Sequence, residues 1–247
     1  DRVYEESVTA SSTKPPSLVA VPLSNDPLHD ENVWSKVPRS VVKSGDKDLA
    51  TVQMGYDARN LYVRFSVTDD SPLKNGADSM NMVFHGGDAV GVYLGSANRK
   101  NEKTLPGDVR LLAAMIGGKP RLVAMKPVTR FAKHPDRYFT PAGGEAKFEF
   151  VGEVPQGQVV LTGDPDGQGY SALLAVPRAF LEVPLQTGTA VAADVEVLLS
   201  GQAARGLQTV SRHYLFSPRN EKTNMIDDVP TEARLYPQYW GVLEIQK

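Results

Sequence analysis

The chain has 247 residues, of which 41% are hydrophobic and 23% charged, a composition typical of a globular protein that buries its own core. Lysine and arginine number 27 against 29 acidic residues, so no basic field indicates binding to nucleic acid through its phosphates. Cysteine is absent, which excludes disulfides, thiolate nucleophiles and cysteine-ligated metal sites, and no run reaches the roughly 20 apolar residues of a membrane helix.

The first part of the chain is expected to be a linker. Residues 1–16 are rich in Ser, Thr and Pro, which favours an extended segment over a helix. Residues 17–22 predict a first short strand, and we interpret residues 17–247 as one domain, because all-β sandwiches reach this length undivided. Trp34 has two interpretations: its indole either offers a face on which a sugar ring stacks or anchors the core.

The strongest pattern lies between residues 51 and 94. Alternating apolar residues at 52–56 and 61–67, joined by a polar turn, predict a β-hairpin with one buried face, and residues 89–94 predict a third strand. Such alternation over the whole chain favours an all-β fold, an antiparallel β-sandwich with one short helix. The long loop at residues 71–87 is either a binding loop or a solvated excursion.

Three acidic residues flank this loop. Asp69 and Asp70 follow the second strand, and Asp88 precedes the third. Carboxylate oxygens are the ligands that Ca²⁺ prefers, so we predict a calcium site formed by Asp69, Asp70 and Asp88.

Four segments carry a resemblance to a known family. Residues 56–72 (YDARNLYVRFSVTDDSP) and 83–94 (VFHGGDAVGVYL) resemble the first half of the family 9 carbohydrate-binding modules, which are related to the DOMON group. Residues 169–177 and 224–241 resemble the later part of these modules, so the resemblance spans roughly residues 28–246.

The resemblance implies a fold, a function and a location. It implies a β-sandwich of the jelly-roll or immunoglobulin-like type and an exported bacterial protein, extracellular or periplasmic, which is often one module of a longer chain. Two positions depart from the family: Gly91 and Leu173 stand where many members carry an acidic residue.

The best candidate for ligand binding is the segment at residues 126–147. It is predicted to be a loop and brings together cationic and aromatic side chains: Arg130, His134, Arg137, Tyr138 and Phe139. Aromatic faces stack on sugar carbons, while arginine donates to hydroxyls, uronates or sulfates. We predict that this loop, with Trp34 as a further candidate, binds a glycan; the alternative is that Phe131 and Phe139 only anchor the loop to the core.

The second half of the chain predicts further strands and one short helix. Proline at 177 opens a helical segment at residues 177–182. Trp240 is expected to pack in the core within the last strand. The remaining strands are predicted at residues 108–116, 121–125, 148–154, 159–161, 170–176, 189–199, 207–216 and 239–245.

The sequence lacks the motifs of the common enzyme classes. The histidines are scattered without HExxH spacing, and neither GxSxG nor GxxxxGK occurs. Together with the resemblance to the family 9 modules, this leads us to expect a non-catalytic carbohydrate-binding module with a glycan or polysaccharide as its partner.

Two other functions remain open. The DOMON relationship allows a haem-binding electron-transfer domain, with axial ligands among Met54, Met80, Met82 and His213. The chain alternatively serves as a structural module of a larger secreted protein, because a sandwich persists after its site is lost.

Overall fold

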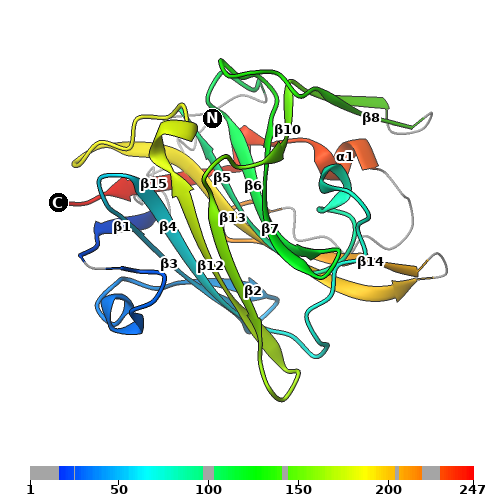
Figure 1. Ribbon diagram of the computed structural model, residues 1–247, viewed down its shortest axis with the longest axis horizontal. Helices are drawn as coiled ribbons and strands as arrows, with labels where there is room; N and C mark the ends of the chain where they lie inside the picture. Colours follow the sequence, from blue (N-terminus) through cyan, green and yellow to red (C-terminus); the bar gives the residue numbers. More distant parts are fainter. Residues whose placement is uncertain (1–16, 25, 97–102, 141–143, 204–205, 219–228) are drawn as a thin grey trace, which may run out of the picture.

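The computed structural model describes residues 17–24, 26–96, 103–140, 144–203, 206–218 and 229–247, so the predicted linker at 1–16 lies outside the described residues. Strands account for most of this part of the chain, as the alternating pattern predicts. The strands form one large sheet that curls until its two halves face each other (Figure 1). This is the all-β sandwich expected from the sequence.

One half of the sheet is built around the predicted hairpin of β3 and β4. It contains β1 (Ser17–Pro22), β2 (Ser40–Ser44), β3 (Lys47–Tyr56), β4 (Asn60–Thr68), β11 (Gln158–Gly163) and β12 (Gly169–Pro177). The other half contains β5 (Ala89–Gly95), β6 (Val109–Ile116), β7 (Lys119–Lys126), β10 (Phe150–Glu153), β13 (Ala190–Ala203) and β14 (Gly206–Tyr214). The predicted hairpins at β3–β4 and β6–β7 are confirmed.

The last strand connects the two halves. β15 (Gly241–Ile245) pairs antiparallel with β13 and parallel with β1, and β1 in turn pairs parallel with β3. These two parallel pairs are exceptions to the antiparallel arrangement that the sequence predicts. The β1–β15 pair joins segments from opposite ends of the chain, whereas the β1–β3 pair joins two segments near its start.

The main core lies between the two halves. One face of each strand contributes apolar side chains, for example Met54 and Phe65 from one half and Val92 and Leu111 from the other, all buried. The alternation of buried and exposed residues in the sequence therefore marks the inward face of these strands.

A second cluster lies on the outer face of β5, β6 and β7. It is covered by a 3₁₀ turn, η2 (Met80–Met82), by a separate hairpin of β8 (Asp136–Thr140) and β9 (Gly144–Phe148), and by the short helix α1 (Val229–Ala233). Phe84, Tyr138 and Phe148 interlock there, with ring centroids 5.3 and 5.7 Å from Tyr138 at nearly perpendicular angles. This cover positions the surface groove considered below.

The structure confirms one local prediction and corrects another. The helical segment predicted at residues 177–182 is the 3₁₀ turn η3 (Arg178–Phe180), and the α-helix in the described part of the chain is α1. The segment at 126–147 is not a continuous loop, because its second half forms β8 and the start of β9. The other 3₁₀ turns are η1 (Glu31–Trp34) and η4 (Pro237–Tyr239).

Candidate functional site

An open groove of about 750 Å³ lies between η2, the start of β8 and the edge strand β10. A volume of a few hundred to a thousand Å³ suits a small-molecule or oligosaccharide segment. The groove is lined by both apolar and polar residues, which are Asp78, Ser79, Met80, Asn81, Ile116, Arg121, His134, Asp136, Phe150, Val151, Gly152, Glu153 and Pro155. We refer to it as the β10 groove.

Hydrogen bonds fix one wall of the β10 groove. Buried Tyr138 donates its hydroxyl to the backbone oxygen of Asn81 at 2.7 Å, and the Asn81 amide donates to Asp136 at 2.6 Å. The backbone N–H of Arg137 donates to the other oxygen of Asp136 at 2.7 Å. Burial raises the pKa of the Tyr138 hydroxyl, which therefore stays protonated and remains a donor. The wall is thus held in place by side chains that are themselves packed.

The opposite wall carries an ion pair. Arg121 from β7 donates through one Nη to both carboxylate oxygens of Glu153 at 3.1 Å, and both side chains are partly exposed. His134 lies exposed nearby, with its ring edge-on to Phe150 at a centroid distance of 5.7 Å. His134 is the one residue of the predicted glycan-binding set that lines the groove.

The other exposed members of the predicted set lie elsewhere. Adjacent residues of a strand point to opposite sides, so Tyr138 faces the second cluster while Arg137 and Phe139 face solvent. Phe139 is 69% exposed, and Arg137 pairs with Glu145 at 3.1 Å. Arg130 is exposed, and its backbone N–H donates to Glu182 at 2.9 Å.

The first half of the predicted loop is anchored by a buried lysine. Lys126 donates to the Phe180 carbonyl at 2.6 Å and to Glu182 at 2.9 Å, and burial lowers its pKa. Its ammonium lies 4.7 Å from the ring centroid of Phe131 and 3.8 Å from that of Phe180. Phe131 therefore serves as an anchor, which supports the structural alternative for that residue.

Two predicted sugar platforms are corrected. Trp34 is 1% exposed and donates its indole N–H to the Pro27 carbonyl at 3.1 Å, so it anchors a small cluster with Tyr62 and Ala175. Tyr138 is 3% exposed and likewise presents no face to a ligand. Both are amphipathic aromatics whose polar atom finds a partner inside the protein.

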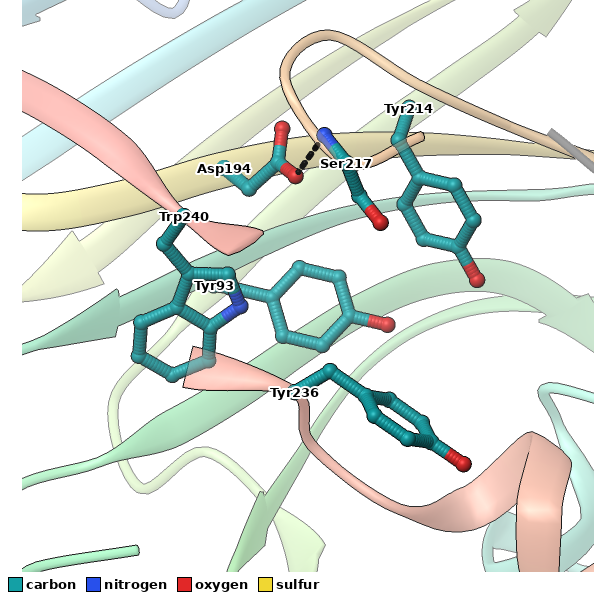
Figure 2. Close-up of a pocket in the computed structure, with 6 residues that line it drawn as sticks. All are labelled: Tyr93, Asp194, Tyr214, Ser217, Tyr236 and Trp240. Carbon is teal, nitrogen blue, oxygen red and sulfur yellow. Dashed lines mark hydrogen bonds between the residues drawn. The ribbon is translucent and has the colours of Figure 1, made fainter. Parts of the chain in front are cut away.

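A smaller crevice lies where the last strand meets the second cluster. Figure 2 shows its lining residues: Tyr93, Asp194, Tyr214, Ser217, Tyr236 and Trp240. Trp240 packs against Tyr93 at a centroid distance of 5.6 Å, which confirms the expected packing role. The crevice has a volume of about 10 Å³, which holds about one water molecule, so the described residues leave no room there for a sugar ring.

The face of β5 beneath the second cluster carries a buried charged network. Arg110 donates to both oxygens of Glu196 at 2.7 and 2.9 Å, and Tyr93 donates to the same carboxylate at 2.9 Å. Gly91 pairs across the strands with Glu196, and a side chain at position 91 would begin only 2.5 Å from Glu196 Oε1. The space left by the glycine is therefore filled by a carboxylate from the neighbouring strand.

The second departure from the family also has a structural role. Leu173 pairs across the strands with Arg64 on β4. Its side chain is partly buried and packs against the small cluster around Trp34.

Of the three predicted calcium ligands, two are buried and influence each other. Asp88 is fully buried and accepts backbone N–H groups from Lys74 at 2.8 Å and Ser200 at 2.5 Å, while Asp69 accepts from Ser71 at 3.1 Å. The pKa of Asp88 is raised to about 6, because burial, together with the charge of Asp69, outweighs the two backbone N–H groups, which lower it. Asp70 is exposed.

The residues proposed as haem ligands do not share one site. Met54 is buried in the main core, whereas Met80 and Met82 pack against the second cluster. His213 lies on β14 with Nε2 3.1 Å from the Ser211 hydroxyl, and burial lowers its pKa.

The fold places the chain in a structural class. The described residues form an all-β sandwich that carries an open groove of mixed polarity on its surface. The helices in the described part of the chain are too short or too polar to cross a membrane.

Known structures give this class a closer counterpart. The fold is similar to a family 9 carbohydrate-binding module from Caldicellulosiruptor kristjanssonii in complex with cellotriose, with 13% identity, coverage of 94% of each chain and a TM-score of 0.58. It is also similar to a family 9 module from the same organism in complex with glucose, with 14% identity, coverage of 94% of this chain and 96% of that chain, and a TM-score of 0.53.

A third structure belongs to a candidate carbohydrate-binding protein of Bacteroides uniformis, with 10% identity, coverage of 94% and 100%, and a TM-score of 0.56. At identities this low, the structural similarity establishes the fold alone. The predicted β-sandwich, similar in fold to the family 9 modules, is confirmed. No protein-family model and no curated protein matches the sequence.

Proposed function

We propose that the chain is a non-catalytic glycan-binding module whose ligand lies in the β10 groove. The observation that carries this proposal is the groove itself, whose lining combines apolar residues, among them Met80, Ile116 and Phe150, with hydrogen-bonding side chains. Sugars present apolar C–H faces and a rim of hydroxyls, so such a surface complements them. The two family 9 modules of similar fold contain cellotriose and glucose, which further supports a saccharide ligand.

The described side chains give little support to catalysis. Ser211 and His213 are within hydrogen-bonding distance, but Nδ1 of His213 is buried without a partner. A triad requires a third group at that nitrogen to orient the imidazole. We accordingly propose a binding role, in an exported protein that is extracellular or periplasmic.

Two glycine variants test where the ligand binds. Gly152 lines the groove, and a side chain there would meet only the Phe150 ring at 3.5 Å, so Gly152→Leu adds a bulky side chain at the groove without a clash with the backbone. Gly163 on the other edge strand has nothing within 4 Å and provides the matched control, Gly163→Leu. Titration calorimetry with glycans selected from an array is expected to show at least about a tenfold loss of affinity for Gly152→Leu alone.

Two results would contradict this assignment. If no glycan on a broad array binds the protein, the function itself is wrong. If Gly152→Leu binds normally while Phe139→Ala loses binding, the ligand instead lies on the exposed face of β8, beside Arg137.

We also propose that calcium binds beside Asp69 and Asp88. Both carboxylates are buried near each other, and the buried Tyr170 hydroxyl, which their charges influence, has no hydrogen-bond partner. A cation would relieve the repulsion that helps raise the pKa of Asp88. No group of three or more acidic or histidine side chains suited to a metal gathers among the described residues, so backbone carbonyls and water would complete the ligand set.

Thermal unfolding tests the calcium proposal. Ca²⁺ at about a hundred times its Kd adds about 2.7 kcal/mol to the free energy of unfolding, so the melting temperature should rise with Ca²⁺ and fall with chelator. Asp69→Asn should abolish that response, whereas the exposed Asp166→Asn should retain it. A melting temperature that neither Ca²⁺ nor chelator changes would contradict the site.

A further inference from the structure

The β10 groove has an excess of negative charge. Three carboxylates line it, Asp78, Asp136 and Glu153, against the single guanidinium of Arg121 and the imidazole of His134. An unbalanced field inside a groove selects ligands by the sign of their charge. This imbalance therefore bears on which glycan the groove accepts.

The one guanidinium is already engaged. Both carboxylate oxygens of Glu153 accept from the same Nη of Arg121 at 3.1 Å, so the pair is locally neutral. A uronate or sulfate entering the groove would have to compete with Glu153 for that donor. The sequence alone suggested arginine as a donor to acidic sugars, but in this groove the arginine has an internal partner.

The two carboxylates on the opposite wall have no cationic partner among the described residues. Asp136 accepts only neutral donors, the Asn81 amide at 2.6 Å and the Arg137 backbone N–H at 2.7 Å. Asp78 is exposed on the loop that precedes η2. Neutral donors orient a carboxylate without cancelling its charge, so this wall remains anionic.

We propose that the β10 groove selects glycans that carry protonated amino groups, of the glucosamine type, over uronates and sulfated sugars. This inference rests on the proposed function and names its ligand class. An ammonium group is a compact charge with three donors, which suits the free acceptor positions of Asp78 and Asp136. The sugar ring then lies against the apolar lining residues Met80, Ile116 and Phe150.

A matched set of oligosaccharides of equal length tests the selectivity. We would titrate the protein with a glucosamine oligomer, its N-acetylated counterpart, a neutral cello-oligosaccharide and a galacturonate oligomer, at mildly acidic pH where the amine is protonated. Ion pairs at partly exposed sites change an equilibrium by up to about fivefold each. The glucosamine oligomer should therefore bind several-fold more tightly than its acetylated counterpart, and galacturonate most weakly.

Charge-removing variants locate the effect. Asp78→Asn and Asp136→Asn should each reduce the ratio of the affinity for the glucosamine oligomer to the affinity for the acetylated oligomer by about two- to fivefold. Asp78→Asn is the cleaner change, because Asp78 is exposed and contributes no hydrogen bond to the wall. The control Asp166→Asn removes the same charge from the turn between β11 and β12, away from β8 (Figure 1).

The outcomes separate this inference from the proposed function. Equal binding of all neutral and amino oligomers, unaffected by either variant, would overturn the charge selectivity and leave glycan binding intact. Tightest binding of galacturonate would also overturn it. If none of the four oligomers binds, and no glycan on a broad array does, the proposed function fails as well.

Discussion

Asp194 provides the sharpest test of the electrostatics in this fold. It lies on β13 with no exposed surface, and its carboxylate accepts backbone N–H groups from Val195 at 2.8 Å and from Phe216 and Ser217 at 3.0 Å. Burial raises the pKa of Asp194 to about 7 from an ordinary value of 3.8, although the three N–H groups lower it. The perturbation we consider is Asp194→Asn, which keeps the shape and removes the titration.

The direction of the pH dependence follows from where the proton binds. Between pH 3.8 and about 7 the folded protein holds a proton on Asp194 that the unfolded chain releases. The stabilisation is therefore complete below pH 3.8 and is lost as the pH rises through about 7. At about 1.4 kcal/mol per pH unit, this interval corresponds to a loss of about 4 kcal/mol.

Urea unfolding of wild type and Asp194→Asn across this pH range measures the effect. The buried indole of Trp34 gives a fluorescence signal for unfolding. Because Asp88 also has a raised pKa, the wild-type slope contains more than one group, and the difference between wild type and variant isolates Asp194. As the pH rises, the free energy of unfolding of the wild type should fall by up to about 4 kcal/mol relative to that of Asp194→Asn. A constant difference, equal to that of the Asp166→Asn control, would refute the reasoning.

Three further predictions concern packing and buried charge, each measured by urea unfolding. Glu196→Gln leaves the buried Arg110 guanidinium without its counter-charge and should cost about 3–5 kcal/mol, whereas Arg110→Met combined with Glu196→Leu should recover most of the loss; an unchanged midpoint for Glu196→Gln contradicts the pairing. Trp34→Ala should lower the free energy of unfolding by about 3–5 kcal/mol and leave glycan affinity unchanged. A loss of affinity without a loss of stability would show that Trp34 contacts the ligand. Gly91→Ala should cost about 1–3 kcal/mol by displacing Glu196, and full stability would show that the carboxylate does not need that space.

The sequence predicts the local elements of this fold well and their distant pairing poorly. Alternation identifies β3 and β4, because every second residue of each enters the main core, whereas β5 is buried along its whole length and is a continuous apolar run in the sequence. The parallel pairing of β1 with β15 joins residues more than 200 positions apart, and no local pattern specifies it. The β8–β9 hairpin was missed because proline, glycine and charged residues interrupt its alternation.

The candidate site was only partly predictable for the same reason. The pattern placed His134 and Tyr138 in a ligand-binding segment, but it could not show that Tyr138 faces inward while Phe139 faces solvent. The opposite wall of the groove comes from β7 and β10, where Arg121 and Glu153 meet across strands. Opposite charges at diagonal positions of neighbouring strands were a usable signal, but only once the strand register was known, because Glu153 faces Val123 and not Arg121.

The charged network beneath α1 indicates what holds the groove wall in place. A buried ion pair such as Arg110–Glu196 is rarely the most stable use of a core position, since apolar side chains of similar size often stabilise more. Here Arg110 also donates to the Glu232 carbonyl of α1 at 2.8 Å, and the Glu232 carboxylate pairs with Arg212 and His85. These contacts are directional, so they fix how α1 covers β8 and β9. The strand that carries Asp136 into the β10 groove is therefore positioned by charges that lie beneath it, and stability and groove geometry should respond together to Glu196→Gln.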